Sequence, residues 1–384
     1  MSRTALCELF GISRETGYKW IRRFERSKDW REVEDRSRRP HDSPNATPAS
    51  LISRAVQMRK KYPRWGPVKL RQLLYQRWPR EPWPSASTIG AILKREGLVR
   101  DRRWRRRLPV RTRPFAACRE PNDLWCIDFK GQFKLGDGRI CYPLTVMDAV
   151  TRFLLACVAF HAPTLANVRA ALEQLFRRYG LPKAFRSDNG EPFASTTSAG
   201  GLTQLSAWWA RLGIRIERID PGKPQQNGRH ERMHLTLKQE TCAPPKYSLG
   251  WQQRAFDRFL YLYNNVRPHQ ALDLATPASL YEPSPRRAPR TLPPLFYPCA
   301  DVYRVDASGN IRWGNRKLFI NSALAGELVG IDQLNRRYAV VVFADVPLGY
   351  LDNTQLHYGL QTLKANMLTA KAMRRSKVSA MSPV

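Results

Sequence analysis

The chain has 384 residues, of which 42% are hydrophobic, so its length allows two to four domains with a sizeable core. Its formal net charge of +33 and its pI near 10.6 exclude an ordinary balanced surface, because so much self-repulsion is tolerated only beside a polyanionic partner. Residues 1–120 carry 31 Lys/Arg against 12 Asp/Glu, so the charge is concentrated at the front of the chain. Nucleic acid is therefore the expected partner.

The cysteines and the apolar runs bear on where the protein resides. Seven cysteines, an odd number without a Cys-x-x-Cys pair, indicate free thiols and exclude a disulfide framework and a zinc ribbon. The first ten residues lack the pattern of a secretory signal, and the longest apolar run, FLLACVAF at 153–160, is too short to cross a bilayer. We expect a cytoplasmic, nucleoid-associated protein with no membrane partner.

Residues 1–34 carry the pattern of a helix-turn-helix. Within TALCELFGISRETGYKWIRRFER (4–26), a short apolar helix, a turn at Gly11 and a second helix capped by Ser13 predict one packed apolar seam. A helical hairpin with a solvated charged face is the alternative interpretation. Only three residues precede the first helix, and a truncated or misassigned start would explain why the usual supporting helix is missing. The second helix leaves these side chains free to contact DNA: Arg14, Thr16, Lys19, Arg22 and Arg23.

Two linkers flank a second predicted helix-turn-helix. Residues 35–48 are polar and contain prolines, as in a linker that follows phosphates. Residues 49–100 predict three helices with apolar inner faces. Residues 101–120 form an arginine-rich linker, in which we expect DNA contacts from Arg102, Arg103, Arg105, Arg106 and Arg107.

The second half of the chain predicts an α/β core followed by a β domain. Residues 121–280 alternate strands and helices and predict a mixed sheet, not a doubly wound one. A proline-rich linker (281–299) leads to short strands with turns (300–355), which predict a small DNA-binding β-barrel. Residues 356–384 predict a disordered basic tail. The expected fold is therefore multidomain, with all-α units ahead of the α/β core.

Three acids stand out by their places in these elements. Asp128 lies mid-strand in WCIDF, where a charge is expensive unless it is paired or bound to a metal. Asp188 ends a strand in RSDNG, and Glu231 lies on the helix after the loop PGKPQQNG. Carboxylates supply hard oxygen ligands for a pair of divalent cations, which can activate the attack on a phosphodiester. We predict these three acids as catalytic and metal-binding, and treat Asp148, also near the core, as structural.

The three acids, the domain order and the phrases NDLWCIDFKGQF, SDNG, PGKPQQNGRHER and YNNVRPHQAL make nearly the whole chain resemble bacterial insertion-sequence transposases of the DDE type. The core of that family is similar to retroviral integrase and has an RNase H-like fold. The resemblance implies Mg²⁺- or Mn²⁺-dependent cleavage at transposon ends, with two ions when DNA is bound, and then attack of the freed 3′-hydroxyl on target DNA. It also implies that the front domains recognise terminal inverted repeats. Joining two ends of double-stranded DNA leads us to expect a dimer or tetramer.

The run QQNGRHERMHLTLKQE (225–240) also contains His-Glu-x-x-His, the pattern of a zinc-binding helix. The extended zinc-protease pattern would place a glycine and a histidine where the chain has Leu237 and Glu240, and no glutamate occurs between 241 and 281 to serve as a downstream ligand. The sequence therefore offers the histidines no third ligand. The nucleic-acid interpretation is therefore favoured. His230 and Met233 are expected to pack on the sheet. The stripe expected to face DNA contains Asn227, Glu231, His234 and Lys238.

Lys130 and Lys223 are further candidate DNA contacts near the acids, although such lysines are as often merely solvated. Two other functions stay open at this point. One is a DNA-binding regulator or decayed copy that no longer catalyses, and the other is a nuclease of the same fold that cuts without joining. Hydrolysis and strand transfer share one metal site and differ in which hydroxyl is placed in line, so the sequence does not separate them.

Overall fold

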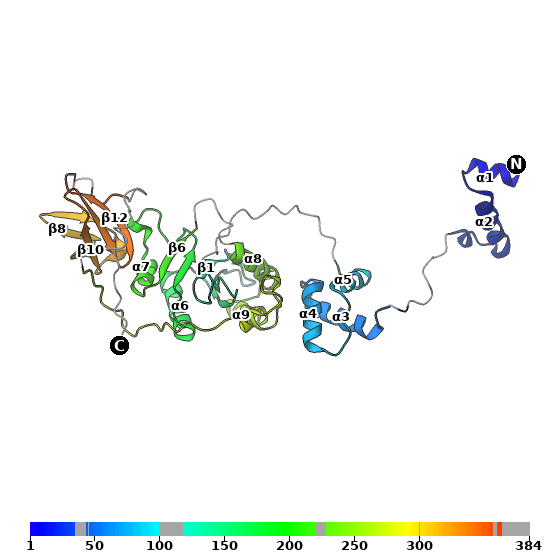
Figure 1. The fold of residues 1–384 in the computed structure, drawn as a ribbon, viewed down its shortest axis with the longest axis horizontal. Coiled ribbons are helices and arrows are strands. Elements are labelled where there is room, and N and C mark those ends of the chain that lie inside the picture. Colours follow the sequence, from blue (N-terminus) through cyan, green and yellow to red (C-terminus); the bar gives the residue numbers. More distant parts are fainter. Residues whose placement is uncertain are drawn as a thin grey trace. The chain divides into compact units, whose positions relative to one another are not determined.

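The computed structural model describes residues 1–34, 44, 46–99, 118–219, 228–298, 300–355 and 359–362 (Figure 1). The chain divides into two compact units, residues 1–54 and residues 55–384, and each is described by itself. Most of the linker 35–48 and most of the tail 356–384 lie outside the described residues. So do the candidate DNA contacts Arg102, Arg103, Arg105, Arg106, Arg107, Lys223 and Asn227.

The first unit contains two helices, α1 (Arg3–Leu9) and α2 (Arg14–Ser27), and a 3₁₀ turn, η1 (Trp30–Val33). The Ser13 hydroxyl caps α2 by accepting a hydrogen bond from the backbone N–H of Thr16 at 3.2 Å. The apolar seam between the helices is only partly formed, because the side chains of Leu6 and Leu9 are 38% and 65% exposed. The prediction of a fully packed seam is therefore wrong, since two short helices cannot enclose so many apolar side chains.

Three more helices follow, α3 (Ala49–Lys61), α4 (Pro67–Arg77) and α5 (Ala86–Arg95). The Arg59 guanidinium ties their ends together by donating hydrogen bonds to the backbone carbonyls of Trp65 and Leu98, at 2.6 and 2.9 Å. The part of this helical group that belongs to the second unit buries an apolar centre made of Met58, Leu70, Leu74, Ile89 and Leu93.

A six-stranded mixed sheet forms the centre of the second unit, as predicted. The strand order is β2-β3-β1-β5-β6, with β4 paired to β3. Strand β1 runs antiparallel to β3 and parallel to β5, so the carboxyl ends of β1 and β5 meet at one edge of the sheet. The strands are β1 (Trp125–Phe129), β2 (Phe133–Lys134), β3 (Ile140–Asp148), β4 (Leu154–Phe160), β5 (Ala184–Ser187) and β6 (Arg215–Arg218).

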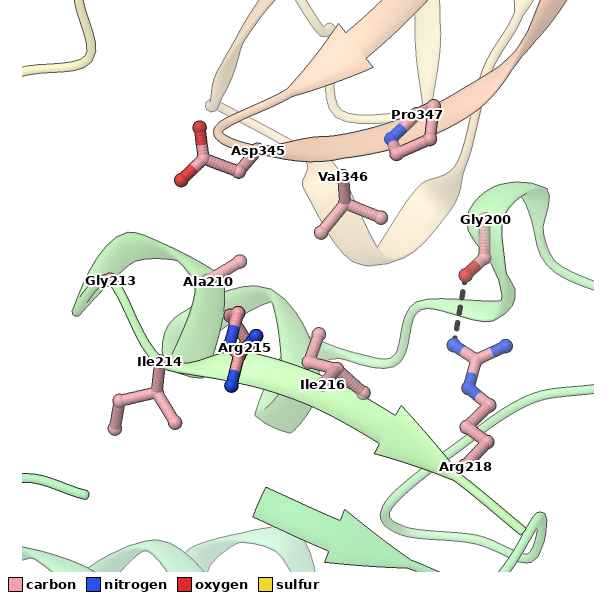
Figure 2. A pocket seen from close by; sticks show the side chains of 10 residues that line it. All are labelled: Gly200, Ala210, Gly213, Ile214, Arg215, Ile216, Arg218, Asp345, Val346 and Pro347. Atoms are coloured by element: carbon pink, nitrogen blue, oxygen red, sulfur yellow. Dashed lines mark hydrogen bonds between the residues drawn. The ribbon is translucent and has the colours of Figure 1, made fainter. Parts of the chain in front are cut away.

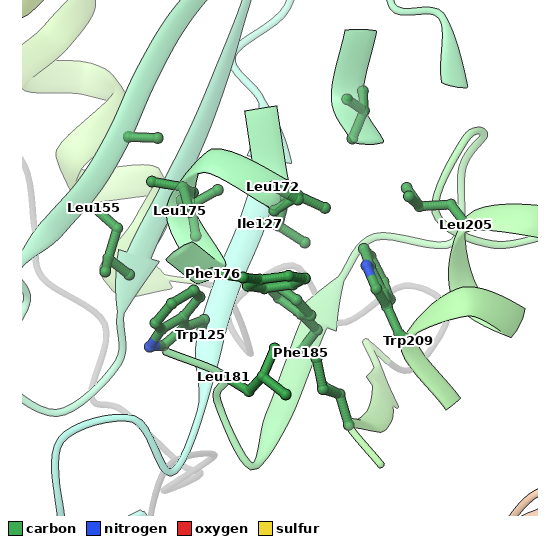
Figure 3. Packing of buried hydrophobic residues seen from close by; sticks show 14 of the residues in the cluster. Trp125, Ile127, Leu155, Leu172, Leu175, Phe176, Leu181, Phe185, Leu205 and Trp209 are labelled. Carbon is green, nitrogen blue, oxygen red and sulfur yellow. The ribbon is translucent and has the colours of Figure 1, made fainter. Parts of the chain in front are cut away.

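Helices cover both faces of this sheet. Helices α6 (Leu165–Tyr179) and α7 (Gln204–Arg211) contribute Phe176 and Trp209 to a core with Trp125 and Phe185 (Figure 3). Helices α8 (Gly228–Leu237) and α9 (Leu249–Asn265) pack on the opposite face through side chains that include Met233, Leu237, Phe256 and Phe259. The described single-turn elements of this region are η2 (Ala199–Gly201), η4 (Lys238–Cys242), η5 (Gln270–Leu272) and η6 (Pro277–Ser279).

The beginning of the predicted linker 281–299 is docked on the core. The Ser284 N–H donates to the Tyr179 carbonyl at 2.8 Å, and the Leu181 N–H donates to the Arg286 carbonyl at 2.7 Å. Between them Gly180 has a φ of +76°, and a side chain there would collide with the Ser284 and Arg286 carbonyls. Glycine therefore allows this close approach of two backbones.

The strands near the C-terminus do not form the predicted closed barrel. Within the described residues, one sheet has the order β12-β11-β10-β7, and β8 pairs with β9 in a separate hairpin. The edge strands β7 and β12 are not paired with each other in these ladders, so the sheet stays open. The elements are β7 (Asp301–Arg304), β8 (Asn310–Trp313), β9 (Arg316–Phe319), η7 (Ser322–Leu324), β10 (Leu328–Gln333), β11 (Tyr338–Phe343) and β12 (Val346–Asp352).

The open sheet shares an apolar core with α7 and the segment before it. Val341 and Phe343 of β11 cluster with Leu202 and with Ala207 of α7. A pocket lies at this junction between β6 and the turn that joins β11 to β12 (Figure 2). Its wall includes Arg218, whose guanidinium donates a hydrogen bond to the Gly200 carbonyl at 2.8 Å.

Among the described helices, none is both long and apolar enough to serve as a membrane span.

Candidate active site

Asp128 and Asp188 reach one edge of the sheet from parallel strands. Asp128 is the fourth residue of β1, and Asp188 directly follows the last residue of β5. Because these strands run in the same direction, their carboxyl ends lie together. The Asp188 carboxylate turns back on its own loop and accepts a hydrogen bond from the Gly190 N–H at 3.3 Å.

Asp188 and Glu231 act electrostatically on Asp128. Burial and, after it, the carboxylates of Asp188 and Glu231 raise the pKa of Asp128 to about 7, against a lowering by the Phe129 N–H and by Lys130. Asp188 and Glu231 are exposed, whereas the Asp128 side chain is 22% exposed. Neighbouring negative charges favour either a bound proton or a bound cation at Asp128.

Two histidines of α8 lie under the same edge. The Thr145 hydroxyl, on the residue that pairs with Asp128 across β1 and β3, is 2.7 Å from Nε2 of both His230 and His234. Nδ1 of His234 is 3.8 Å from the Asp128 carboxylate. Both imidazoles are buried, at 0% and 7% exposure. Burial lowers the pKa of His230 to about 3 and that of His234 to about 2, so both rings are neutral near pH 7.

This arrangement changes two expectations. His234 does not lie on an exposed stripe with Lys238. Residues 230, 233, 234 and 237 of α8 are all buried, and together they form the inner face of the helix. The structure also offers the histidines a candidate third ligand, which is Asp128. Asp128, His230 and His234 each offer a ligand atom, and these atoms lie within 4.8 Å of one another. Sequence spacing could not reveal this partner because Asp128 lies on a distant strand.

Thr145 is the residue that the sequence reading missed. It is fully buried in an otherwise apolar strand, ICYPLTVMD, and its hydroxyl touches Asp128, His230 and His234. A polar residue within an apolar strand is a signal that could have been followed, because a buried hydroxyl requires partners.

The remaining candidate DNA contacts keep side chains at the surface. Lys238 is exposed at the end of α8, and Lys130 is half-buried after β1. On α2, Arg14, Lys19 and Arg22 are exposed, and Thr16 and Arg23 are partly exposed. Their contacts with DNA stay predictions.

The donor set fits a divalent cation. Among the described residues, the ligand atoms that lie within 4.8 Å of one another belong to Asp128, His230 and His234, and Asp188 and Glu231 are not part of this group. The carboxylate oxygen is a hard ligand of the kind that Mg²⁺ and Mn²⁺ accept. A second sign is a buried polar atom with nothing to bind: Nδ1 of His230 has no hydrogen-bond partner among the described residues. The arrangement is suited to holding cations against an anionic substrate such as a phosphodiester.

Comparison with known proteins gives matches over most of the chain. Two family models, both described as integrase core domain, match residues 119–224 and 212–277, and a homeodomain-like domain model matches residues 16–93. The insertion element IS407 uncharacterized 31.7 kDa protein of Burkholderia multivorans is 28% identical over 59% of this chain and 79% of its own length. The insertion element IS476 uncharacterized 39.2 kDa protein of Xanthomonas euvesicatoria is 30% identical over 62% of this chain and 66% of its own.

Sequence similarity to a viral polyprotein covers a shorter stretch. The Gag-Pol polyprotein of feline leukemia virus is 31% identical over 32% of this chain and 7% of its own length. Among solved structures, the HTLV-2 integrase catalytic core domain in complex with magnesium covers 42% of this chain and 98% of that chain, with 16% identity and a TM-score of 0.34.

Proposed function

Because this chain belongs to the bacterial insertion-sequence transposases with a retroviral integrase-like core, we propose that it cuts DNA at the ends of its own element and joins those ends to target DNA. Asp128, Asp188 and Glu231 are the proposed catalytic and metal-binding residues. The chain covers 66% of the length of one curated relative, so the reaction of the whole protein is part of the proposal.

The observation that carries this proposal is the effect of Asp188 and Glu231 on Asp128, a carboxyl group at the edge of the sheet. The pKa of Asp128 is raised by burial and then by Asp188 and Glu231. A fold gains no stability from such a group, because an unpaired buried charge opposes folding. Its presence is explained if the acids hold cations during the reaction.

The chain's own residues would have two kinds of role, metal binding and DNA binding. The three acids would hold two Mg²⁺ or Mn²⁺, which would supply activation of the attacking oxygen and stabilisation of the leaving one. Lys130 and Lys238 place the backbone phosphates beside the acids. Lys223 and Asn227, which lie outside the described residues, would contact the same DNA strand.

Binding to the ends of the element is assigned to the basic front of the chain. The terminal inverted repeats are read by side chains of α2, namely Arg14, Thr16, Lys19, Arg22 and Arg23. His234 is buried beside Asp128 and does not contact DNA. The arginines of the linker 101–120 neutralise phosphates, and the open C-terminal sheet adds a further DNA surface. Two ends must meet for joining, so the active form is a dimer or tetramer on cytoplasmic DNA.

The test uses a labelled duplex that carries the imperfect inverted repeat flanking the gene, with Mg²⁺ and a plasmid target. Glu231→Gln should abolish both cleavage and joining while a gel shift shows unchanged binding. Glu173→Gln, at a partly exposed glutamate on α6 that pairs with Arg169, is the matched control and should behave as the wild type.

The products also separate the alternatives. Joined products from the wild type support the transposase, whereas nicked ends without joining indicate a nuclease. Binding with neither product indicates a regulator. Loss of binding in Glu231→Gln would mean that this glutamate has a structural role and would refute its assignment as a metal ligand.

A further inference from the structure

The Thr145 hydroxyl lies at the centre of the histidine cluster and has only one proton to share. It contacts three atoms: the backbone carbonyl of Asp128 at 3.1 Å, and Nε2 of His230 and of His234 at 2.7 Å each. A carbonyl oxygen can only accept, so the hydroxyl proton is donated to Asp128. Both imidazoles must then donate their Nε2–H to the lone pairs of Thr145.

This hydrogen-bond pattern fixes the tautomer of both rings. With the proton on Nε2, a neutral imidazole carries a lone pair on Nδ1. For His230 this atom has no partner among the described residues, which agrees with the absence of a proton there. For His234 the lone pair faces the Asp128 carboxylate across 3.8 Å. Two acceptors cannot hydrogen-bond to each other, whereas both can bind a cation.

From this geometry we propose that Nδ1 of His234 is a ligand of the cation held by Asp128, which makes the site a mixed nitrogen and oxygen site that prefers Mn²⁺ to Mg²⁺. The inference rests on the proposed function, because it concerns the same cation. It adds a ligand that the three acids do not supply, and it assigns a metal preference.

The dimensions and the surroundings of His234 support this role. Metal bonds to imidazole nitrogen and carboxylate oxygen are each about 2.1 Å, so one ion can bridge atoms up to about 4 Å apart. A metal-bound histidine usually donates its other N–H to a fixed partner, and here Nε2–H donates to Thr145. Imidazole suits transition metals, whereas Mg²⁺ prefers oxygen, so a nitrogen ligand shifts the preference toward Mn²⁺.

The experiment measures metal binding by the full chain without DNA, after removal of metals by a chelator. Calorimetric titration with Mn²⁺ alone and with Mg²⁺ alone gives the two affinities, and pulsed electron paramagnetic resonance of the Mn²⁺ form detects a directly coordinated ¹⁴N. The wild type should show the nitrogen coupling and bind Mn²⁺ about tenfold or more above Mg²⁺, the scale on which ligand-shell changes act.

Variants locate the nitrogen. His234→Gln should lose the coupling and the Mn²⁺ preference while it keeps Mg²⁺ binding. Thr145→Val, which removes the acceptor for Nε2–H, should weaken Mn²⁺ binding about tenfold. His161→Gln, at an exposed histidine that contacts the Ile140 carbonyl, is the matched control and should leave coupling and preference unchanged.

The outcomes distinguish the two proposals. Absence of nitrogen coupling in wild-type Mn²⁺ protein, or its persistence in His234→Gln, overturns the histidine ligand while end cleavage can still succeed. Absence of binding for either metal, in a wild type that also fails to cleave, overturns the metal site of the proposed function and the histidine ligand with it. The wild-type spectrum alone is decisive if a variant fails to fold.

Discussion

Two aspartates on neighbouring strands, Asp148 and Asp128, have different surroundings within the same fold. Asp148, at the end of β3, is 0% exposed, and its carboxylate accepts four hydrogen bonds, from the N–H groups of Asn122, Val150 and Thr151 and from the Thr151 hydroxyl. Asp128, on β1, instead faces Asp188 and Glu231. Burial raises the pKa of both, so burial does not distinguish them. The surroundings do: hydrogen-bond donors support a structural role for Asp148, and neighbouring acids support the proposed metal-binding role of Asp128.

The largest expected effect separates activity from stability at Asp128. Asp128→Asn should lower end cleavage about a thousandfold or more, because metal ions contribute several kcal/mol to the transition state. The same change removes a charge that opposes folding, so the melting temperature at pH 8 in a chelator should not fall. Cleavage assays and thermal melts of one preparation provide the test. A lower melting temperature with intact cleavage would make Asp128 a structural acid and would reverse the comparison.

Asp148→Asn should show the opposite behaviour. An amide can keep some of the hydrogen bonds, but its NH₂ group must then face an N–H donor such as that of Asn122, and the charge-assisted bonds are lost. We expect the free energy of unfolding to fall by about 3 kcal/mol. The folded fraction should still cleave DNA, because Asp148 does not contact the site. Urea unfolding followed by tryptophan fluorescence measures the loss. Full stability together with lost cleavage would contradict the structural assignment.

The sequence was sufficient to predict the mixed sheet and to single out both aspartates. Asp128 in WCIDF and Asp188 in RSDNG occupy strand positions that alternation and turn chemistry indicate, and parallel pairing of β1 with β5 then brings them to one edge. The mixed sheet was predicted correctly because it depends on local patterns and on one rule of sheet geometry, and the roles of the two aspartates stay predictions.

The histidine cluster could not be predicted in the same way. The rotation of α8 about its axis depends on which side chains β1 and β3 offer, and a helix wheel drawn from 228–237 alone leaves His234 at the boundary between two faces. The partner Thr145 lies 85 residues from His230 along the chain. The open C-terminal sheet was missed for a related reason, because alternation predicts strands but not whether the edge strands β7 and β12 pair.

A smaller effect tests one hydrogen bond in the Asp148 network. The Thr151 hydroxyl donates to the Asp148 carboxylate at 2.7 Å and accepts from the Phe153 N–H at 3.3 Å. Thr151→Val keeps the shape and removes both bonds, and should cost about 1.5 kcal/mol, the value for a hydrogen bond to a charged group. Thr197→Val, in an exposed loop, should change stability by less than about 0.5 kcal/mol. Equal losses in the two variants would show that the network does not hold the β3–β4 turn.

The smallest effect concerns pH and returns to Asp128. Its pKa in the folded protein is about 7, above the ordinary value of 3.8, so the folded state binds the proton more tightly than the unfolded state. The resulting stabilisation is fully present below pH 3.8 and is lost as pH rises through 7. Asp188, Glu231, Lys130 and the neutral His234 are the groups that face the carboxyl.

In a chelator, the wild type should therefore lose about 1 kcal/mol of stability between pH 6 and pH 8 relative to Asp128→Asn. The comparison with the variant matters because His230, His234 and His269 have lowered pKa values and contribute the opposite trend to both proteins. Saturating Mn²⁺ should abolish the difference by replacing the proton with a cation. If stability changes equally with pH for the two proteins in the chelator, Asp128 is already ionised at pH 6. Its three-acid environment then does not hold a proton.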